Sequence, residues 1–213
     1  MIYVNSRPLN RFAPAAPTPD RFFQHTHTPE DGKAVLEMLS SSYALIKDGE
    51  RDETVFTVPG RSEYMLRVAR EEDDEGELEM RTRLGEDGKL GHWERTVREK
   101  MPLRRGLRAR IGQRIPRLKP ALMTYEDPRS LAEAFSKKTR AVNTRVRRRV
   151  FGDDNVQAAF SEYTLPDVEG GPVAVSTLTV RSENPETLRE LLATLGVSET
   201  SSESVQDVLL RAA

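Results

Sequence analysis

The sequence contains no cysteine among its 213 residues. This absence excludes disulfides, thiolate zinc sites and cysteine nucleophiles, and it suits a reducing compartment. Histidine is nearly as scarce: there are three, and two of them, His25 and His27, lie close together near the N-terminus. None has a partner at metal-ligand spacing, which argues against a histidine metal site or a Ser-His-Asp triad.

Long apolar runs are also missing. No stretch approaches the roughly 18 apolar residues of a membrane-spanning helix, so we expect no membrane span. The N-terminal segment MIYVNSRPLNRF lacks the apolar region of a signal peptide. The chain is 37% apolar, which is enough for a sizeable core, and its length favours one domain. We predict a partly flexible N-terminal arm over residues 1–28 and a single β-barrel domain over residues 29–213.

The charges nearly cancel, to a net −1, but they are segregated along the chain. Residues 71–79 hold seven acids, residues 95–119 hold ten bases against one acid, and residues 137–149 hold seven bases and no acid. Such blocks form solvated faces or contact polyanions. The near-neutral balance of the whole chain favours solvated faces.

Four segments show helical signals. Residues 28–47 begin with Thr-Pro-Glu-Asp, which suits the first turn of a helix, and carry apolar residues at helical spacing up to about Lys47. Asp127 precedes a second helix, and Asn184 precedes a leucine-rich third that ends near Gly196. A short fourth helix covers residues 204–211.

Seven segments between residues 54 and 181 favour strands, because they alternate or are β-branched and end at turn residues. They cover residues 54–58, 63–70, 77–84, 90–97, 142–151, 156–165 and 173–181. They predict an antiparallel meander, closed or nearly closed into a barrel, in an α+β fold with helices at the N- and C-terminal ends. Residues 100–122 hold three prolines and two glycines among bases, and we predict a long, basic, mobile loop there.

The segment at residues 77–84 is the most suggestive of chemistry. Its alternation places Glu77, Glu79, Arg81 and Arg83 on one face and apolar residues on the other. Inside a barrel, the two carboxylates could hold a divalent cation and the two guanidiniums a phosphate. Facing water, the same pattern is an ordinary amphipathic strand, which the pattern alone favours.

Arg145, Arg147 and Arg149 form a second candidate, alternating on one strand face with Arg148 opposite. Inside a barrel they could bind phosphates, and outside they could meet an acidic partner or RNA. A solvated edge that discourages aggregation explains the same pattern.

The acidic strand, the later Arg-rich strand and the Leu-rich terminal helix resemble the tunnel triphosphatase superfamily, which includes CYTH-type phosphatases and metal-dependent RNA 5′-triphosphatases. The resemblance implies a barrel of the tunnel-triphosphatase type. Glu77 and Glu79 would bind Mg or Mn, and Arg81, Arg145 and Arg147 would bind phosphate. The chain departs from the family on its last strand, VAVSTLTV, where active members carry further carboxylates. Two carboxylates make a poor cage for a hard cation, so the implied metal site is at best half built.

A non-enzymatic branch of that superfamily, Mediator head-module subunits eighteen and twenty, is similar in length and element order. The similar strings lie within residues 30–195 and read TVFTVPG, EYMLRVAR, ELEMRTRLG, SLAEAF, TRVRRRVF and VQAAFSEYTLP. This resemblance implies a non-catalytic transcription coregulator in the nucleus, with no catalytic residues, metal or other cofactor. Its partners would be a sister barrel in a heterodimer, other Mediator head subunits and RNA polymerase II.

The basic segment would then supply partner contacts, through Arg104, Arg105, Arg108, Arg110, Arg114 and Arg117. Two alternatives stay open. A metal-dependent RNA 5′-triphosphatase or CYTH-type polyphosphate hydrolase predicts that carboxylates from several strands converge in the barrel. An RNA- or polyanion-binding barrel, using residues 145–149 and 100–119, predicts binding that weakens steeply with salt.

Overall fold

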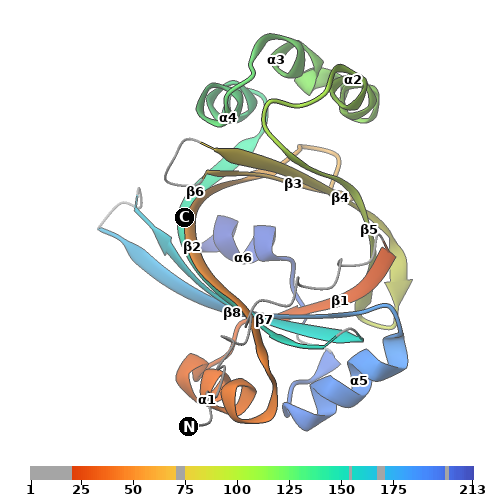
Figure 1. Cartoon of the computed structure of the whole chain (residues 1–213), viewed down its shortest axis with the longest axis vertical. Helices are drawn as coiled ribbons and strands as arrows, with labels where there is room; N and C mark the ends of the chain where they lie inside the picture. The colour runs from red at the N-terminus through yellow and green to blue at the C-terminus, as the bar shows by residue number, and fades with distance from the viewer. Residues whose placement is uncertain (1–20, 71–74, 154, 167–170, 200–201) are drawn as a thin grey trace, which may run out of the picture.

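The computed structural model describes residues 21–213 except 71–74, 154, 167–170 and 200–201, and within them eight antiparallel strands close into a barrel (Figure 1). The order around the barrel is β1-β5-β4-β3-β2-β6-β7-β8, and β8 pairs back on β1. The strands are β1 (Arg21–His27), β2 (Leu45–Thr57), β3 (Tyr64–Arg70), β4 (Gly76–Asp87), β5 (Leu90–Lys100), β6 (Arg140–Gly152), β7 (Val156–Leu165) and β8 (Val173–Ser182). The predicted antiparallel barrel is therefore confirmed.

Strand β1 departs from the N-terminal arm predicted over residues 1–28. It pairs with β5 on one side and with β8 on the other, and it thereby closes the barrel. Phe22, Gln24 and Thr26 are buried on its inner face. Because this face mixes an aromatic with polar side chains, the segment lacks the apolar alternation that marks a strand in the sequence. The sequence of the predicted arm also allows an early strand at residues 2–4, and this segment lies outside the described residues.

The first helix, α1 (Gly32–Ser42), is shorter than the predicted span to Lys47. It begins after Asp31, whose side chain accepts a hydrogen bond from the Ala34 backbone N–H at 2.9 Å. β2 already begins at Leu45 and pairs with β6 along its length. This long ladder supplies backbone hydrogen bonds from a strand far away in the sequence, and it outweighs the helical spacing that precedes it.

The segment predicted as a basic mobile loop, residues 100–122, is instead largely helical. It forms α2 (Arg105–Arg114), the 3-10 turn η1 (Pro116–Leu118) and the beginning of α3 (Lys119–Thr124). Apolar residues recur about every four positions in this segment. In a helix this spacing places them in one buried stripe, which explains why the segment is helical although it is rich in bases. The stripe consists of Leu103, Leu107, Ile111, Ile115, Leu118 and Leu122.

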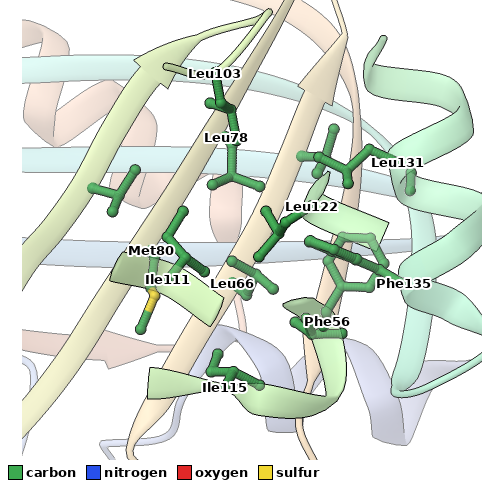
Figure 2. Packing of buried hydrophobic residues seen from close by; sticks show 14 of the residues in the cluster. Phe56, Leu66, Leu78, Met80, Leu103, Ile111, Ile115, Leu122, Leu131 and Phe135 are labelled. Carbon is green, nitrogen blue, oxygen red and sulfur yellow. The ribbon is translucent and has the colours of Figure 1, made fainter. Parts of the chain in front are cut away.

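A large core lies between the outer face of the barrel and the helical cap, the name used here for α2, η1, α3 and α4 (Pro128–Ser136) (Figure 2). Asp127 caps α4, as predicted, by accepting from the Ser130 backbone N–H. The Phe135 ring packs edge-on against Phe56 of β2, with the ring centroids 5.5 Å apart. Strands β3 and β4 contribute their outward apolar residues, Leu66, Val68, Leu78 and Met80.

Helices α1 and α5 (Pro185–Thr194) cover a part of the barrel away from the helical cap (Figure 1). Asn184 caps α5 by accepting from the Glu186 backbone N–H at 2.9 Å. Gly196 follows the helix with a φ of 65°, as predicted for a C-terminal cap. The core under α5 contains its residues Leu188, Leu191 and Leu192. It also contains outward residues of β7 and β8, which include Phe160 and Val180.

The last helix, α6 (Val205–Ala212), lies within the ring of strands (Figure 1). Its apolar side chains contact inward residues of the wall, namely Val55, Val142, Val146 and Tyr163. Gln206 donates from Nε2 to the backbone oxygens of Phe56 at 2.9 Å and Tyr64 at 3.3 Å. The C-terminal helix thus fills part of the barrel interior. None of the helices within the described ranges is long and apolar enough to cross a membrane.

Candidate functional site

The barrel interior holds a set of buried charges. Alternation along β4 turns Glu79 and Arg81 inward, each 2% exposed, and Leu78 and Met80 outward. The alternation predicted for this strand is confirmed, and the closed barrel places its charged face inside rather than toward water. Neighbouring strands add inward charges from Arg51, Glu53, Arg67, Arg95, Arg148 and Arg181.

Glu53 of β2 is surrounded by three guanidiniums. Its Oε1 accepts from Arg51 Nε at 2.8 Å and from Arg67 Nη1 at 3.2 Å. Arg148 of β6 donates from Nη1 to the same oxygen at 3.4 Å. Burial by itself would raise the pKa of Glu53, but the arginines outweigh burial and hold this pKa well below its usual range. Glu53 is therefore an ion-paired carboxylate rather than a free acid or base.

Glu79 of β4 is held in the same way. It accepts from Arg67 on one oxygen and from Arg81 on the other. Arg95 Nε lies 3.7 Å from Glu79 Oε1. Burial would raise the pKa of Glu79, yet Arg67 and Arg81 hold it well below the usual value. Arg67 bridges both buried carboxylates, so the two clusters form one network across β2, β3 and β4.

Guanidiniums outnumber carboxylates in this interior. Arg181 donates from Nε to Gln24 Oε1 at 3.0 Å and lies over the Phe22 ring, 5.4 Å from its centroid. Burial lowers the pKa of Arg181 well below its usual value, and the neighbouring Arg81 lowers it further. The pKa of Arg81 itself falls to about 10, chiefly through burial. Such a surplus of buried positive charge attracts anions.

Among the described residues, a small cavity lies beside these charges. The interior cavity measures about 20 Å³, and Val205 of α6 is part of its lining. A cavity of this size admits roughly one water molecule. A larger anion would not fit in this cavity unless α6 or one of the arginine side chains moved.

The carboxylates of β4 do not fit a divalent cation. Glu77 pairs with Arg98 at 2.9 Å, and Glu79 is engaged by arginines on both oxygens. Mg²⁺ and Mn²⁺ prefer sets of several oxygen ligands. Within the described residues, no three His, Asp or Glu side chains gather in an arrangement that could hold a metal ion. Guanidiniums instead engage both oxygens of Glu79, whereas Glu77 Oε1 is buried 4.0 Å from Arg51 Nη1 and has no hydrogen-bond partner among the described residues.

The predicted phosphate ligands of β6 lie on the other face of the barrel. Arg145 pairs with Asp52 at 3.1 Å and Arg147 with Asp48 at 3.1 Å, and both arginines are half exposed or more. Arg148, which the alternation places opposite them, is the residue that points inward. The structure therefore brings Arg81 close to Glu79 but separates Arg145 and Arg147 from both.

Sequence reasoning missed Glu53, Arg67, Arg148 and Arg181 as interior residues. Each occupies an inward position on its strand, so the two-residue period was the available signal. It was hidden because the inward face of each strand carries only one or two charges among apolar or hydroxyl residues. These residues lie together because of how the strands pair, and local sequence patterns do not show that pairing.

The six arginines predicted for partner contacts divide into two groups. Arg108 is buried and donates to the Leu103 backbone oxygen at 2.6 Å and to Glu126 at 2.9 Å. Arg114 is partly buried and donates to the hydroxyls of Thr82 and Thr96. Both therefore help to fasten α2 to the chain around it. The exposed members are Arg104, Arg105, Arg110 and Arg117.

Comparison with known proteins bears on the fold. No protein-family model matches the sequence, and no curated protein matches it. A Hippeastrum protein, described as a putative adenylyl cyclase with a dominant triphosphatase activity, is 14% identical with a TM-score of 0.54, over 90% of this chain and 95% of its own. The PH1819 protein of Pyrococcus horikoshii OT3 is 14% identical with a TM-score of 0.50, over 89% of this chain and 98% of its own.

A looser likeness, with a TM-score of 0.44 at 10% identity, joins the chain to the Schizosaccharomyces pombe Mediator head module, over 86% of this chain and 96% of that one. At such identities, the feature shared with the Hippeastrum protein is the fold. The predicted class, an antiparallel barrel of the tunnel-triphosphatase type with helices at its ends, is thereby confirmed.

Proposed function

We propose that this chain is a non-catalytic barrel that acts through protein contacts, as a transcription coregulator subunit of the Mediator-head type. The observation that carries the non-catalytic part is that Glu53 and Glu79 are both buried among guanidiniums. A carboxylate whose lone pairs are taken and whose pKa is low is a poor metal ligand and a poor general base. The packing of α6 within the ring supports the same proposal, because its apolar residues contact the wall and its Val205 lines the cavity of about 20 Å³ beside the charges.

The transcriptional part rests on the sequence resemblance to Mediator head-module subunits eighteen and twenty. The proposed partners are a sister barrel in a heterodimer, other head subunits and RNA polymerase II, and the proposed location is the nucleus. The exposed arginines of the helical cap are the proposed contacts for acidic surfaces: Arg104, Arg105, Arg110 and Arg117.

Two measurements test this proposal. Purified protein, incubated with ATP, RNA 5′-triphosphate or tripolyphosphate in Mg²⁺ or Mn²⁺, is expected to release no more phosphate than the protein-free control. Co-expression with Mediator head subunits of the same organism is expected to yield a stable heterodimer in size-exclusion chromatography. Metal-dependent phosphate release that disappears in Glu77→Gln would contradict the proposal.

The second candidate is a metal-dependent RNA 5′-triphosphatase or CYTH-type polyphosphate hydrolase, with Mg or Mn as cofactor. The surplus of inward arginines supports it, because guanidiniums suit a polyphosphate. The fold shared with a barrel described as having triphosphatase activity supports it as well. This candidate predicts phosphate release that falls in Glu79→Ala and Arg81→Ala but not in Arg147→Ala, whose side chain lies outside the barrel. Thermal unfolding of each variant separates lost activity from lost fold.

A further inference from the structure

A groove of about 1040 Å³ lies on the outside of the barrel, between α4 and strands β2 and β6. One wall is a single face of α4, with Arg129, Glu133 and Ser136 at helical spacing, followed by Lys137 directly after the helix. The opposite wall comes from the strands, with Asp52, Thr54, Arg70, Asn143, Arg145 and Thr164. The groove is separate from the arginine-rich interior, because Arg145 projects outward from β6 while Arg148 projects inward.

Bases dominate the charge of this groove: four of them face two acids. Asp52 is already paired with Arg145, with 3.1 Å between Oδ1 and Nε. Arg129 and Lys137 are exposed on the α4 wall. The Nε of Arg70 is buried and has no hydrogen-bond partner among the described residues. The groove therefore presents several donors that a ligand carboxylate could satisfy.

We propose that this groove binds an acidic peptide segment of a partner protein. Carboxylates of the peptide pair with Arg129, Lys137 and Arg70. A basic or amide side chain of the peptide meets Glu133. The hydroxyl and amide groups of the strand wall, from Thr54, Asn143 and Thr164, suit the polar backbone of a peptide.

The same lining disfavours a nucleic acid. Its described residues include no aromatic ring on which a base could stack. Glu133 would also repel a continuous phosphate backbone, whereas a peptide can place a basic or amide side chain beside it. The volume, about 1040 Å³, matches or exceeds that of ordinary small-molecule clefts, which suits a short peptide segment. The proposal holds whether or not the barrel interior is catalytic, because the two sites share no arginine.

The test uses the full chain and a short fluorescein-labelled peptide rich in Glu and Asp, with binding measured by fluorescence polarisation. We expect saturable binding that weakens as ionic strength rises. The double variant Arg129→Glu/Lys137→Glu is expected to weaken binding about tenfold or more, because it reverses two charges of the groove. The matched control, Lys33→Glu/Lys89→Glu, makes the same charge change on exposed lysines outside the groove and is expected to weaken binding less than about twofold.

Three results would overturn the proposal: equal losses in the two double variants, tighter binding of a labelled single-stranded oligonucleotide than of the peptide, or no peptide binding at low ionic strength. Circular dichroism verifies that each variant is folded. If the charge-reversed variant does not fold, Arg129→Gln/Lys137→Gln takes its place, and it must still bind the peptide more weakly than Lys33→Gln/Lys89→Gln.

Discussion

His25 lies on the outer face of β1 and is completely buried. It sits opposite Val180 of β8, whose side chain belongs to the core under α1 and α5. Neither ring nitrogen has a hydrogen-bond partner within the described residues. A buried imidazole without partners is stable only when it is neutral, so the fold should weaken in acid as this side chain takes up a proton.

The magnitude follows from proton linkage. Burial, with a smaller contribution from His27, lowers the pKa of His25 from 6.5 to about 4. Between these values the unfolded chain binds more protons than the folded chain, so stability is full above pH 6.5 and falls as the pH drops toward 4. At pH 5 the unfolded imidazole is nearly all protonated and the folded one nearly all neutral, which corresponds to a loss of about 2 kcal/mol relative to pH 7.5.

Urea unfolding of the wild-type chain and of His25→Leu at pH 7.5 and pH 5 measures this loss. Leucine keeps the site apolar and gives up no hydrogen bond, so the variant should lose about 2 kcal/mol less than the wild type on acidification. Glu53 and Glu79 add only about 0.2 kcal/mol each to the loss of stability at pH 5. Both proteins carry these residues, so their contribution cancels in the comparison. His27→Gln, two residues along the same strand, serves as the control and should keep most of the acid loss of the wild type, because His27 makes the smaller contribution to the lowered pKa of His25. Equal acid losses in His25→Leu and the wild type would refute the reasoning.

Three further outcomes are expected in urea unfolding at neutral pH. Glu53→Gln should lower the free energy of unfolding by about 3–5 kcal/mol, because it leaves three guanidiniums without their shared carboxylate. The control Glu63→Gln, in an exposed pair with Arg61, should lower it by less than about 1 kcal/mol. Similar losses in the two variants would contradict the buried network. Phe135→Ala should cost about 3–5 kcal/mol through the cavity it leaves against Phe56, while the exposed Tyr125→Ala should stay within about 0.5 kcal/mol. Gln206→Ala should lower the free energy of unfolding by about 1–3 kcal/mol, because it removes the donor to two backbone oxygens of the barrel wall. An unchanged free energy would mean that these hydrogen bonds do not hold α6 within the ring.

Local patterns in the sequence were enough to predict strands β2 to β8 and helices α1, α4, α5 and α6. The alternation of residues 77–84, the turn residues between strands and the caps at Asp127 and Asn184 each report on their own neighbourhood. Errors arose where distant pairing outweighed local preference. β2 extends back to Leu45 because β6 supplies a partner, and residues 21–27 form a strand because β5 and β8 flank them. The helical cap was hidden because prolines, glycines and bases obscured its four-residue apolar spacing.

The sequence by itself determined which side chains share a face of each strand, because successive residues of a strand point to opposite sides. It could not determine which face is inside, since that depends on how the barrel closes and where helices cover it. Arg145 and Arg147 accordingly lie outside while Arg148 lies inside. Only the tertiary structure brings Glu53, Glu79 and their arginines together from five strands, β2 to β6, because ion pairs between strands are set by the order and register of pairing.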